Sequence, residues 1–427
     1  MSPPVLGSDF RRLWQAYAVS AAGSAIAAGA LPLVAVLVLD ASAMEVSVLA
    51  ALSAATGALS VLPMSHRIDR HRKRPVMIAA DLVRFAVLAS VPAAAVLDRL
   101  TFAHLYAAAT VQAAAAIVFT AASEAHLKAL VAAELRGEAN SRFESTNWLA
   151  QSVGPPVGGA LVAAFGATAT ILVDAVSFLL SALGIQRVRQ PETAVPAPAH
   201  TTAVRRDAVA GWTYILSHAQ LRPLFWNAML FGGAVMWCTP LIAVFMLRDL
   251  DLNPWQYGLA FGLPCLGGIA GARLMPRFTR RLGERGTLLL FGVLRTPWLL
   301  VLPLASPGTP GLLLVIAADV ALLFAAGVFN PAFVTFRMDI TQDRLMARVV
   351  SAWLISSRSV QPLFMVAGGL LAAATSVRHA LAVGGALCLV SALCLPWRTA
   401  RPLPGAEAFE EGARRTDVQP RSRFSAV

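Results

Sequence analysis

Charge is scarce in this sequence. Only 14% of its 427 residues are charged, whereas 57% are apolar. A soluble globular chain carries about 25% charged residues and roughly 45–50% apolar ones. The shortage of charge therefore argues against a soluble domain. It favours a chain that crosses a membrane several times, because apolar runs as long as a spanning helix recur along nearly the whole sequence.

Cysteine is also rare, and the residue patterns of enzymes are missing. The four cysteines lie inside apolar runs, which predicts small buried side chains and no disulfide framework. The seven histidines are scattered without metal-ligand spacing. No Gly-x-x-x-x-Gly-Lys-Ser/Thr loop occurs, which argues against direct use of ATP. We therefore expect no enzyme, no cofactor and no metal site.

The cations that are present fall into short clusters between apolar runs. His66–Arg74 holds five of them. Each charge at the centre of a bilayer costs at least about 2.5–3.5 kcal/mol, so this loop must stay in water. Loops rich in Lys and Arg lie on the cytoplasmic side. The net charge of +12 is thus interpreted as a topology signal, and no nucleic-acid partner is expected.

Counting outward from that loop predicts an all-α membrane protein with twelve spanning helices. The expected spans are 13–39, 45–64, 75–97, 102–123, 145–166, 168–187, 222–247, 255–276, 286–305, 310–333, 347–372 and 379–397. The first run is too long for the apolar part of a signal peptide. This layout puts 29 of the 35 Lys and Arg residues on the cytoplasmic side. We expect a multi-pass protein of the cell (inner or plasma) membrane with both termini cytoplasmic.

The chain divides into two halves joined by a linker. We expect a six-helix bundle at 1–189, a cytoplasmic linker at 190–221, a second six-helix bundle at 222–397 and a disordered tail at 398–427. Within the linker, 204–218 is predicted to form an amphipathic helix on the membrane surface.

The two halves are pseudo-repeats of one another. A shift of 210 residues places Gln151 on Gln361, and a shift of 211 residues places Arg84 on Arg295. Two six-helix halves in parallel repeat are typical of secondary transporters that rock around a site at the membrane midplane.

Two motifs give the chain a family resemblance. Ser65, Asp69, Arg70, Arg72, Lys73 and Arg74 follow the pattern Gly-x-x-x-Asp-Arg-x-Gly-Arg-Arg/Lys, with both glycines replaced. Gly154-Pro155-Pro156-Val157-Gly158-Gly159 matches the end of an antiporter signature, Gly-Pro-x-x-Gly-Gly. The chain resembles the major facilitator superfamily, in the exporter branch of siderophore, macrolide and multidrug efflux proteins. The arginine that many drug–proton antiporters carry in helix four is absent.

The resemblance implies roles for several of these residues. Asp69, Arg70 and Arg74 are implied to close the inner gate; a solvated charge run that only fixes topology is the alternative. Asp81 and Arg84 lie three residues apart in one predicted span and can pair with each other, so we expect them to be structural or to support the gate. Gly154, Pro155, Gly158 and Gly159 are implied to form the antiporter motif in a kinked helix. Asp174 is expected to be structural.

Asp319 and Arg358 are ionisable residues inside predicted spans. Counted at 1.5 Å per residue, both lie near midplane at similar levels, so they can pair if both face inward. Intramembrane charges are functional candidates by default, although a structural ion pair is an equal alternative. We expect Asp319 to carry protons, with Arg358 tuning it or binding an anionic group of the substrate.

Polar amides and two tryptophans complete the candidate set. Amides inside spans need partners, so helix–helix hydrogen bonds compete with a role in lining a cavity. The candidates are Gln112, Asn147, Trp148, Gln151, Asn227, Trp237 and Gln361.

The sequence thus predicts a secondary transporter that exports a small organic molecule, such as an antibiotic, siderophore or metabolite, by proton antiport. The expected partners are that substrate, protons and membrane lipid, and the protein is expected to be a monomer. A lipid or lysolipid flippase, a sensor or scaffold that transports nothing, and an importer remain alternatives, because a fold does not fix the direction of transport.

Overall fold

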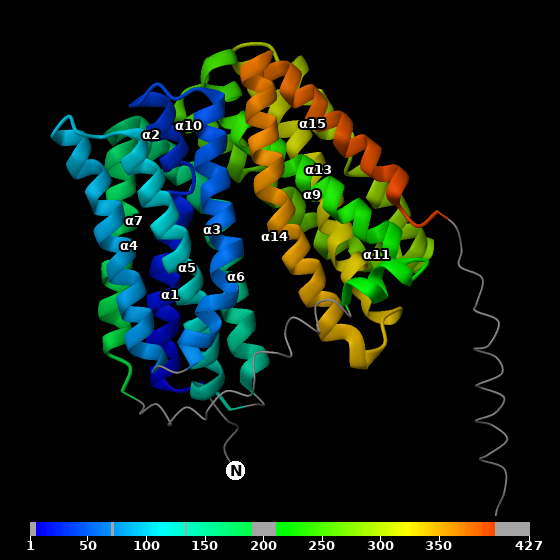
Figure 1. Cartoon of the computed structure of the whole chain (residues 1–427), viewed down its shortest axis with the longest axis horizontal. Coiled ribbons are helices and arrows are strands. Elements are labelled where there is room, and N and C mark those ends of the chain that lie inside the picture. The colour runs from blue at the N-terminus through cyan, green and yellow to red at the C-terminus, as the bar shows by residue number, and fades with distance from the viewer. Residues whose placement is uncertain (1–5, 70–71, 133–134, 190–210, 398–427) are drawn as a thin grey trace, which may run out of the picture.

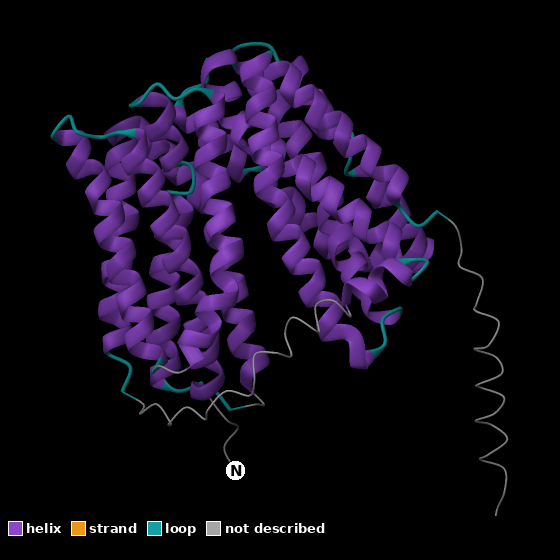
Figure 2. Cartoon of the chain, viewed as in Figure 1, coloured by secondary structure: helices purple, strands orange, loops and turns teal. Residues whose placement is uncertain are grey.

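The computed structural model describes residues 6–69, 72–132, 135–189 and 211–397, and of these only the backbone at 57–69, 137, 140, 343, 344 and 347. This part of the chain is helical and contains no strand (Figure 2). Its elements are α1 (Ser8–Ile26), α2 (Ala30–Leu37), α3 (Ala43–Asp69), α4 (Lys73–Val96), α5 (Phe102–Leu130), α6 (Arg136–Phe165), α7 (Ala167–Gln186), α9 (Leu221–Val244), η2 (Phe245–Asp249), α10 (Pro254–Gly262), α11 (Pro264–Leu294), α12 (Trp298–Val301), η3 (Leu302–Leu304), α13 (Thr309–Asp339), α14 (Asp343–Ala374), α15 (Val377–Ser391) and η4 (Ala392–Cys394). Residues 211–217 are also helical.

These elements make twelve passes, as the sequence predicts. Nine stretches of the described chain are long and apolar enough to span a membrane. One of them, Pro254–Leu304, crosses twice, because Gly283 turns the backbone there with a φ of +72°. The remaining two passes are α3 and α6, whose 27 and 30 residues give lengths of about 40 and 45 Å. The chain is a multi-pass, all-α membrane protein.

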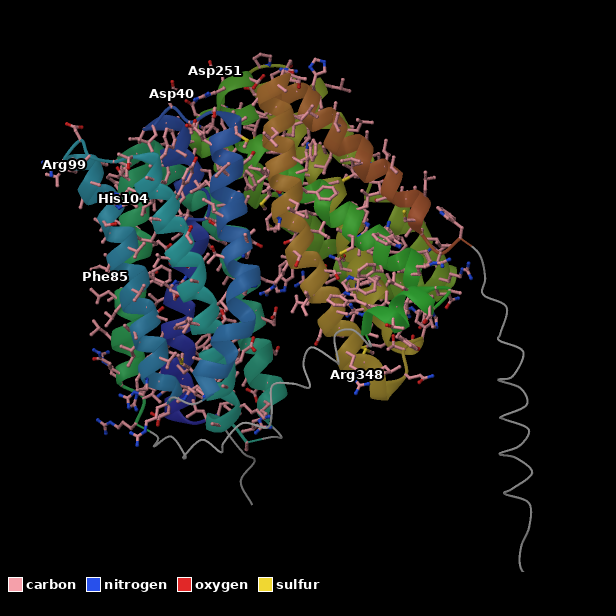
Figure 3. All side chains as sticks on the ribbon, in the orientation of Figure 1. Asp40, Phe85, Arg99, His104, Asp251 and Arg348 are labelled. Carbon is pink, nitrogen blue, oxygen red and sulfur yellow. The ribbon has the colours of Figure 1, made fainter. Side chains whose placement is uncertain are left out.

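The helices form two groups that meet at one end of the molecule (Figure 1). One group holds α1–α7 and the other α9–α15. In the figure α3 and α14 come together at the top and diverge towards the bottom. We call the bottom, where α1 begins and α3 ends, the basic end, and the top the far end. Figure 3 places Asp40 at the far end and Arg348 at the basic end.

Among the residues whose side chains the structure describes, the hydrophobic core shared between the groups lies at the far end. There one cluster of buried residues contains Val34 and Leu105 from the first group together with Leu241 and Leu312 from the second. Towards the basic end each group has its own cluster. One surrounds Phe10, Met77 and Phe119, and the other surrounds Leu224, Phe291 and Val349. Burial of apolar surface thus holds the halves together at the far end, while each half packs by itself at the basic end.

Polar contacts at the two ends follow the same division. At the far end Arg248 forms an ion pair with Asp40 of the other half. At the basic end Arg74 donates to the carbonyl oxygens of Ile185 and Gln186 at the end of α7, within its own half. Its counterpart in the repeat, Arg285, donates to the carbonyl oxygens of Pro396 and Trp397. A cation at the carboxyl end of the last helix therefore recurs in both halves.

The described part of the predicted surface helix packs against the second half. Trp212 donates its indole N–H to Ser356 Oγ on α14 at 2.9 Å, and Ile215 is fully buried. A Cβ at Gly211 would lie 2.2 Å from the carbonyl oxygen of Arg348. Residues 211–217 are thus attached to the base of α14, whereas 204–210 and the tail 398–427 lie outside the described residues.

Candidate functional site

The Gly-Pro-Pro-Val-Gly-Gly sequence lies where α6 meets both α1 and the opposite half. A Cβ at Gly158 would sit 1.9 Å from the carbonyl oxygen of Ile26, the last residue of α1. A Cβ at Gly159 would sit 2.9 Å from Gly258 Cα on α10. Only glycine allows backbones to approach so closely. The prolines do not break α6, which continues as one helix from Arg136 to Phe165.

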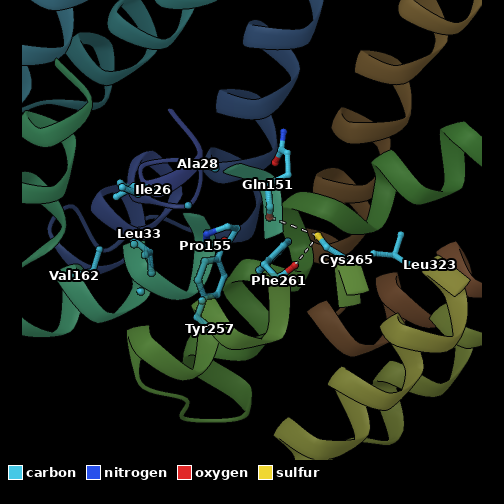
Figure 4. Close-up of a pocket in the computed structure, with 15 residues that line it drawn as sticks. Ile26, Ala28, Leu33, Gln151, Pro155, Val162, Tyr257, Phe261, Cys265 and Leu323 are labelled. Atoms are coloured by element: carbon cyan, nitrogen blue, oxygen red, sulfur yellow. Dashed lines mark hydrogen bonds between the residues drawn. The ribbon is translucent and has the colours of Figure 1, made fainter. Parts of the chain in front are cut away.

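A cavity of about 330 Å³ lies beside this seam (Figure 4). Its walls come from both halves and are mostly apolar. They are Ile26, Ala28, Gly29, Ala30, Leu33, Gln151, Pro155, Gly158, Gly159, Val162, Tyr257, Gly258, Phe261, Cys265 and Leu323. Cavities of roughly 300–1,000 Å³ with few polar groups are typical of small-molecule sites.

The local sequence of α10 places an aromatic wall in this cavity. Asn253 and Gln256 form a capping box, in which the Gln256 side chain accepts from the Asn253 N–H at 2.8 Å, and Pro254 takes the first helical position. Tyr257 therefore stands in the first turn, with its ring 4.8 Å from that of Phe261. A Cβ at Gly29 would lie 2.7 Å from the Tyr257 ring, so the break between α1 and α2 leaves room for it.

Three polar groups face this cavity or border it. Gln151 lines it with an exposed side chain. Cys265 donates its thiol to the carbonyl oxygen of Gln151 at 3.6 Å, across the seam (Figure 4). The Tyr257 hydroxyl has no hydrogen-bond partner among the described residues. A bound molecule could therefore exchange hydrogen bonds with the Tyr257 hydroxyl and the Gln151 amide.

Asp319 lies on α13, four residues before the cavity residue Leu323 and so on the same helix face. It is partly buried, and within the described part of the chain it has no hydrogen bond or ion pair. Its charge acts on the buried thiol of Cys238 on α9. An acid without a counterion near a cavity is available to bind a proton.

The expected pair between Asp319 and Arg358 does not form in this structure. Neither side chain has an ion-pair partner in the described residues. The expected depths of the two residues in the membrane were wrong, because α13 continues past 333 to Asp339 and α14 already begins at Asp343. Counted from these ends, Asp319 lies about 30 Å and Arg358 about 22 Å from the basic end.

A buried polar cluster joins four helices of the first half. Arg84 on α4 donates to Asp81 Oδ1 at 3.5 Å, to Gln112 Oε1 on α5 at 3.1 Å and to Ser24 Oγ on α1 at 3.5 Å. Ser24 in turn donates to Asp174 Oδ1 on α7 at 3.2 Å. Gln112 is thus a partner of Arg84 and does not line the cavity described above.

The equivalent position in the second half has different partners. Arg295 is buried, and its guanidinium donates to Asn227 Oδ1 at 2.7 Å; the Asn227 amide donates to the carbonyl oxygen of Ser391 at 2.7 Å. The guanidinium also stacks on Phe329, 3.5 Å from the ring centroid. Within the described residues no carboxylate pairs with Arg295. The second half thus has an arginine at the same position as the first half, but its hydrogen-bond partner is an amide and not a carboxylate.

The remaining predicted residues are spread over other environments. Trp237 donates to the carbonyl oxygen of Ala380 at 2.8 Å and packs between helices, and neither it nor Asn227 lines the cavity. Trp148 is 53% exposed. Asn147 and Gln361 are partly buried and lie outside this cavity lining. The Asp69 side chain and all of Arg70 lie outside the described residues, so the inner-gate role stays a prediction.

Some cavity residues carried no clear signal in the sequence. Tyr257, Phe261 and Cys265 read as ordinary apolar helix residues. The one available sign was the Asn-Pro-x-Gln start of α10, which fixes where the helix begins and therefore which residues fall in its first turns.

Comparisons with known proteins agree with this architecture. Residues 13–359 match the family model described as Major Facilitator Superfamily. A curated relative, the multidrug efflux pump Tap of Mycolicibacterium fortuitum, is 26% identical over 348 residues, which cover 79% of this chain and 82% of the relative.

Solved structures resemble the chain in fold. A bacterial homologue of the iron transporter ferroportin, in an inward-facing state, has a TM-score of 0.73 at 17% identity and covers 92% of this chain and 98% of its own. The nucleoside transporter NupG has a TM-score of 0.70 at 12% identity and covers 91% and 98%. At such low identity these similarities show the fold alone.

Proposed function

Because the chain belongs to the major facilitator superfamily, whose members are transporters and not enzymes, we propose that it exports a small organic molecule by alternating access, driven by proton antiport. The curated relative is named as a multidrug efflux pump, which supports export. The Gly-Pro-x-x-Gly-Gly sequence of α6, an antiporter signature by resemblance, supports exchange against an ion.

The observation that carries the proposal is the cavity between halves that share a core only at the far end. The cavity has walls from α1, α2, α6, α10, α11 and α13, so a molecule inside it contacts both halves at once. The shared core closes the space between the halves at the far end, whereas the halves have separate cores towards the basic end. Alternating access requires such a difference between the two ends. Rocking the halves would transfer the opening to the opposite end.

The orientation of the protein in the membrane follows from its cations. Arg74, Arg285 and Arg348 lie at the basic end, and the positive-inside rule places that end in the cytoplasm. In this proposal the protein acts as a monomer in the cell membrane, both termini are cytoplasmic, and the structure represents an inward-facing state. The substrate enters the cavity from the cytoplasm or the inner leaflet and leaves on the far side.

The cavity lining indicates the class of substrate. Its walls are aliphatic and aromatic, and the described lining residues include no charged side chain. A small, largely apolar molecule with one or two polar groups fits these walls, because Gln151 and Tyr257 can hydrogen-bond it while Phe261 covers its apolar part. Antibiotics, siderophores and metabolites of amphipathic character belong to this class.

Asp319 supplies the proton site in this proposal. Its carboxylate has no counterion in the described residues and lies one helical turn from Leu323 in the cavity wall. A proton taken from the far side neutralises Asp319, and its release to the cytoplasm restores the charge. Substrate and proton then alternate within a single rocking cycle.

The test is accumulation of a panel of fluorescent dyes and labelled antibiotics in cells with and without the protein. We expect lower accumulation of at least one amphipathic compound in expressing cells, and recovery of accumulation when a protonophore collapses the proton gradient. Cells expressing Asp319→Asn at the same membrane level serve as the control. Export that persists unchanged under the protonophore would refute proton antiport, and equal accumulation for all compounds would refute export of this class.

A further inference from the structure

The first half of the protein holds an acid cluster to which neither the transport cycle nor the family resemblance assigns a proton. We propose that Asp81, Arg84 and Asp174 form a buried proton-binding site, in which two carboxylates share one proton and Ser24 links the site to the central cavity. This site is separate from Asp319, and the experiment below distinguishes the two.

The charges of the cluster do not balance without a proton. Asp81 is 0% exposed, Asp174 5% and Arg84 7%. Asp81 pairs directly with the Arg84 guanidinium, and Asp174 is connected to the same guanidinium through Ser24, so full ionisation of both acids would leave a net negative charge inside the helix bundle. Uncompensated charge in such a place is strongly disfavoured, whereas two carboxyl groups that share one proton leave the cluster neutral. The proton belongs to the pair and not to either acid alone.

Among the described residues, no cation other than Arg84 compensates this charge. Around α4 at this level, α7 contributes Asp174, whereas α5 contributes the neutral Gln112 and α1 the neutral Ser24. No further charged side chain acts on either carboxylate in the described part of the chain. The hydrogen bonds support this conclusion, because Asp81 Oδ2 is buried and makes no hydrogen bond of normal geometry to the described residues; the Ser181 hydroxyl on α7 is the one neutral donor that acts on this carboxyl group. A carboxyl oxygen that accepts no hydrogen bond is better accommodated in a neutral group.

The repeat provides an internal comparison. Arg295 occupies the position of Arg84 in the second half and is equally buried. An amide and two aromatic faces hold it, and no acid of the described residues pairs with it. The fold can therefore keep this arginine without carboxylates. The two acids of the first half are therefore not needed to bury the arginine, which favours a role for them other than neutralising its charge.

Ser24 connects the cluster to the cavity. Its hydroxyl donates to Asp174 Oδ1 at 3.2 Å and accepts from Arg84 Nη2 at 3.5 Å. Two residues further along the chain, Ile26 ends α1 and lines the cavity. Loss of the shared proton would therefore change the charge beside Ser24, two residues from the cavity wall.

Infrared spectroscopy of the purified full-length protein in lipid nanodiscs tests the site, because the C=O stretch of a protonated carboxyl group is separate from that of a carboxylate. The parent for every comparison is Asp319→Asn, which removes any signal from Asp319. We expect this parent to show a protonated-carboxyl band at neutral pH. Absence of the band would overturn the proposal without any further variant.

The variants give a pattern that a simple buried acid would not give. Adding either Asp81→Asn or Asp174→Asn should abolish the whole band, because the remaining acid ionises beside Arg84. Adding Arg84→Gln should double the band, since both acids are then neutral. Loss of the band with only one of the two aspartate variants would overturn the shared proton.

Glu138→Gln is the matched control, because Glu138 forms an exposed ion pair with Arg142 and should leave the band unchanged. Failure of Asp319→Asn to abolish proton-driven export would refute the proposed role of Asp319 and leave this band intact. The two proposals are therefore tested independently.

Discussion

Gly159 of α6 and Gly258 of α10 face each other across the seam, and a Cβ on either residue would lie 2.9 Å from the Cα of the other. A contact of two backbones cannot be relieved by a side-chain rotation. The two glycines therefore set how closely the halves approach at the far end, where the hydrophobic core is shared.

Alanine at either of these glycines should weaken closure at the far end. We expect Gly159→Ala to cost about 1–3 kcal/mol in the closed state, because one methyl group is forced into a packed contact. The measurement is the thermal unfolding midpoint in detergent together with the export rate, both of which should fall. Gly232→Ala on α9 is the control, since a Cβ there meets nothing within 4 Å. Equal behaviour of the two variants would contradict the close contact.

Replacement of Asp319 should abolish the coupling of export to protons without affecting folding. Asp319→Asn removes the proton-binding group but keeps the size of the side chain, so the protein should fold and reach the membrane while export falls to the level of cells without it. Asp319→Glu retains a carboxyl group and should keep part of the activity. Export is measured at several external pH values, and an unchanged pH dependence in Asp319→Asn would exclude Asp319 as the carrier.

The Arg295 environment predicts opposite effects of two substitutions at Asn227. Asn227→Leu leaves the buried guanidinium without its hydrogen-bond acceptor, which should destabilise the protein by about 1.5–3 kcal/mol. Asn227→Asp supplies a counter-charge at the same place and should be less harmful. Thermal unfolding of the two purified variants ranks them, and a lower midpoint for Asn227→Asp than for Asn227→Leu would contradict this account.

His218 should make stability depend on pH at the start of α9. Its Nδ1 accepts from the backbone N–H groups of Gln220 and Leu221, both at 3.3 Å. Burial lowers the pKa of His218 below its ordinary value of 6.5. The unfolded chain therefore binds a proton first as the pH falls, and stability is lost on going from above 6.5 towards the lowered pKa.

The matched variant for this effect is His218→Asn, whose amide oxygen can accept the same bonds without titrating. The unfolding midpoint should fall more steeply with decreasing pH in the unchanged protein than in the variant. The difference between the two pH profiles isolates His218 from the other titrating groups. Parallel profiles would show that His218 does not contribute.

The sequence predicted the passes and the local Asp81–Arg84 pair, but not the partners that intramembrane polar groups find on distant helices. Twelve apolar runs separated by basic loops were visible because the cost of placing a charge in hydrocarbon acts on each segment separately. The glycines of α6 were also recognised, because the Gly-Pro-x-x-Gly-Gly sequence matches the antiporter signature of the family that the chain resembles. The expected Asp319–Arg358 pair does not form, because α13 continues to Asp339 and α14 already begins at Asp343, and no local pattern in the sequence marks these ends.

The sequence predicted only part of the candidate site, because contacts between distant helices decide which polar residues line the cavity. Gln151 lines the cavity, but Gln112 binds Arg84, and Asn227 binds Arg295. An amide inside a span needs a hydrogen-bond partner, but the sequence does not show which helix provides that partner. Asp174 was expected to be structural, and only the packing of α1 and α4 against α7 placed it next to Ser24 and within reach of Arg84.

By itself the sequence determined the number of passes, the basic character of one end and the internal repeat, because hydrophobicity and charge act residue by residue along the chain. Only the tertiary structure decided that the halves share a core at the far end and that Tyr257 and Phe261 face Gly29 and Gln151. It also decided that Arg84 pairs with Asp81 and is linked through Ser24 to Asp174, whereas Arg295 pairs with no acid of the described residues. Each of these depends on how helices distant in sequence rotate and pack against one another, which no single segment encodes.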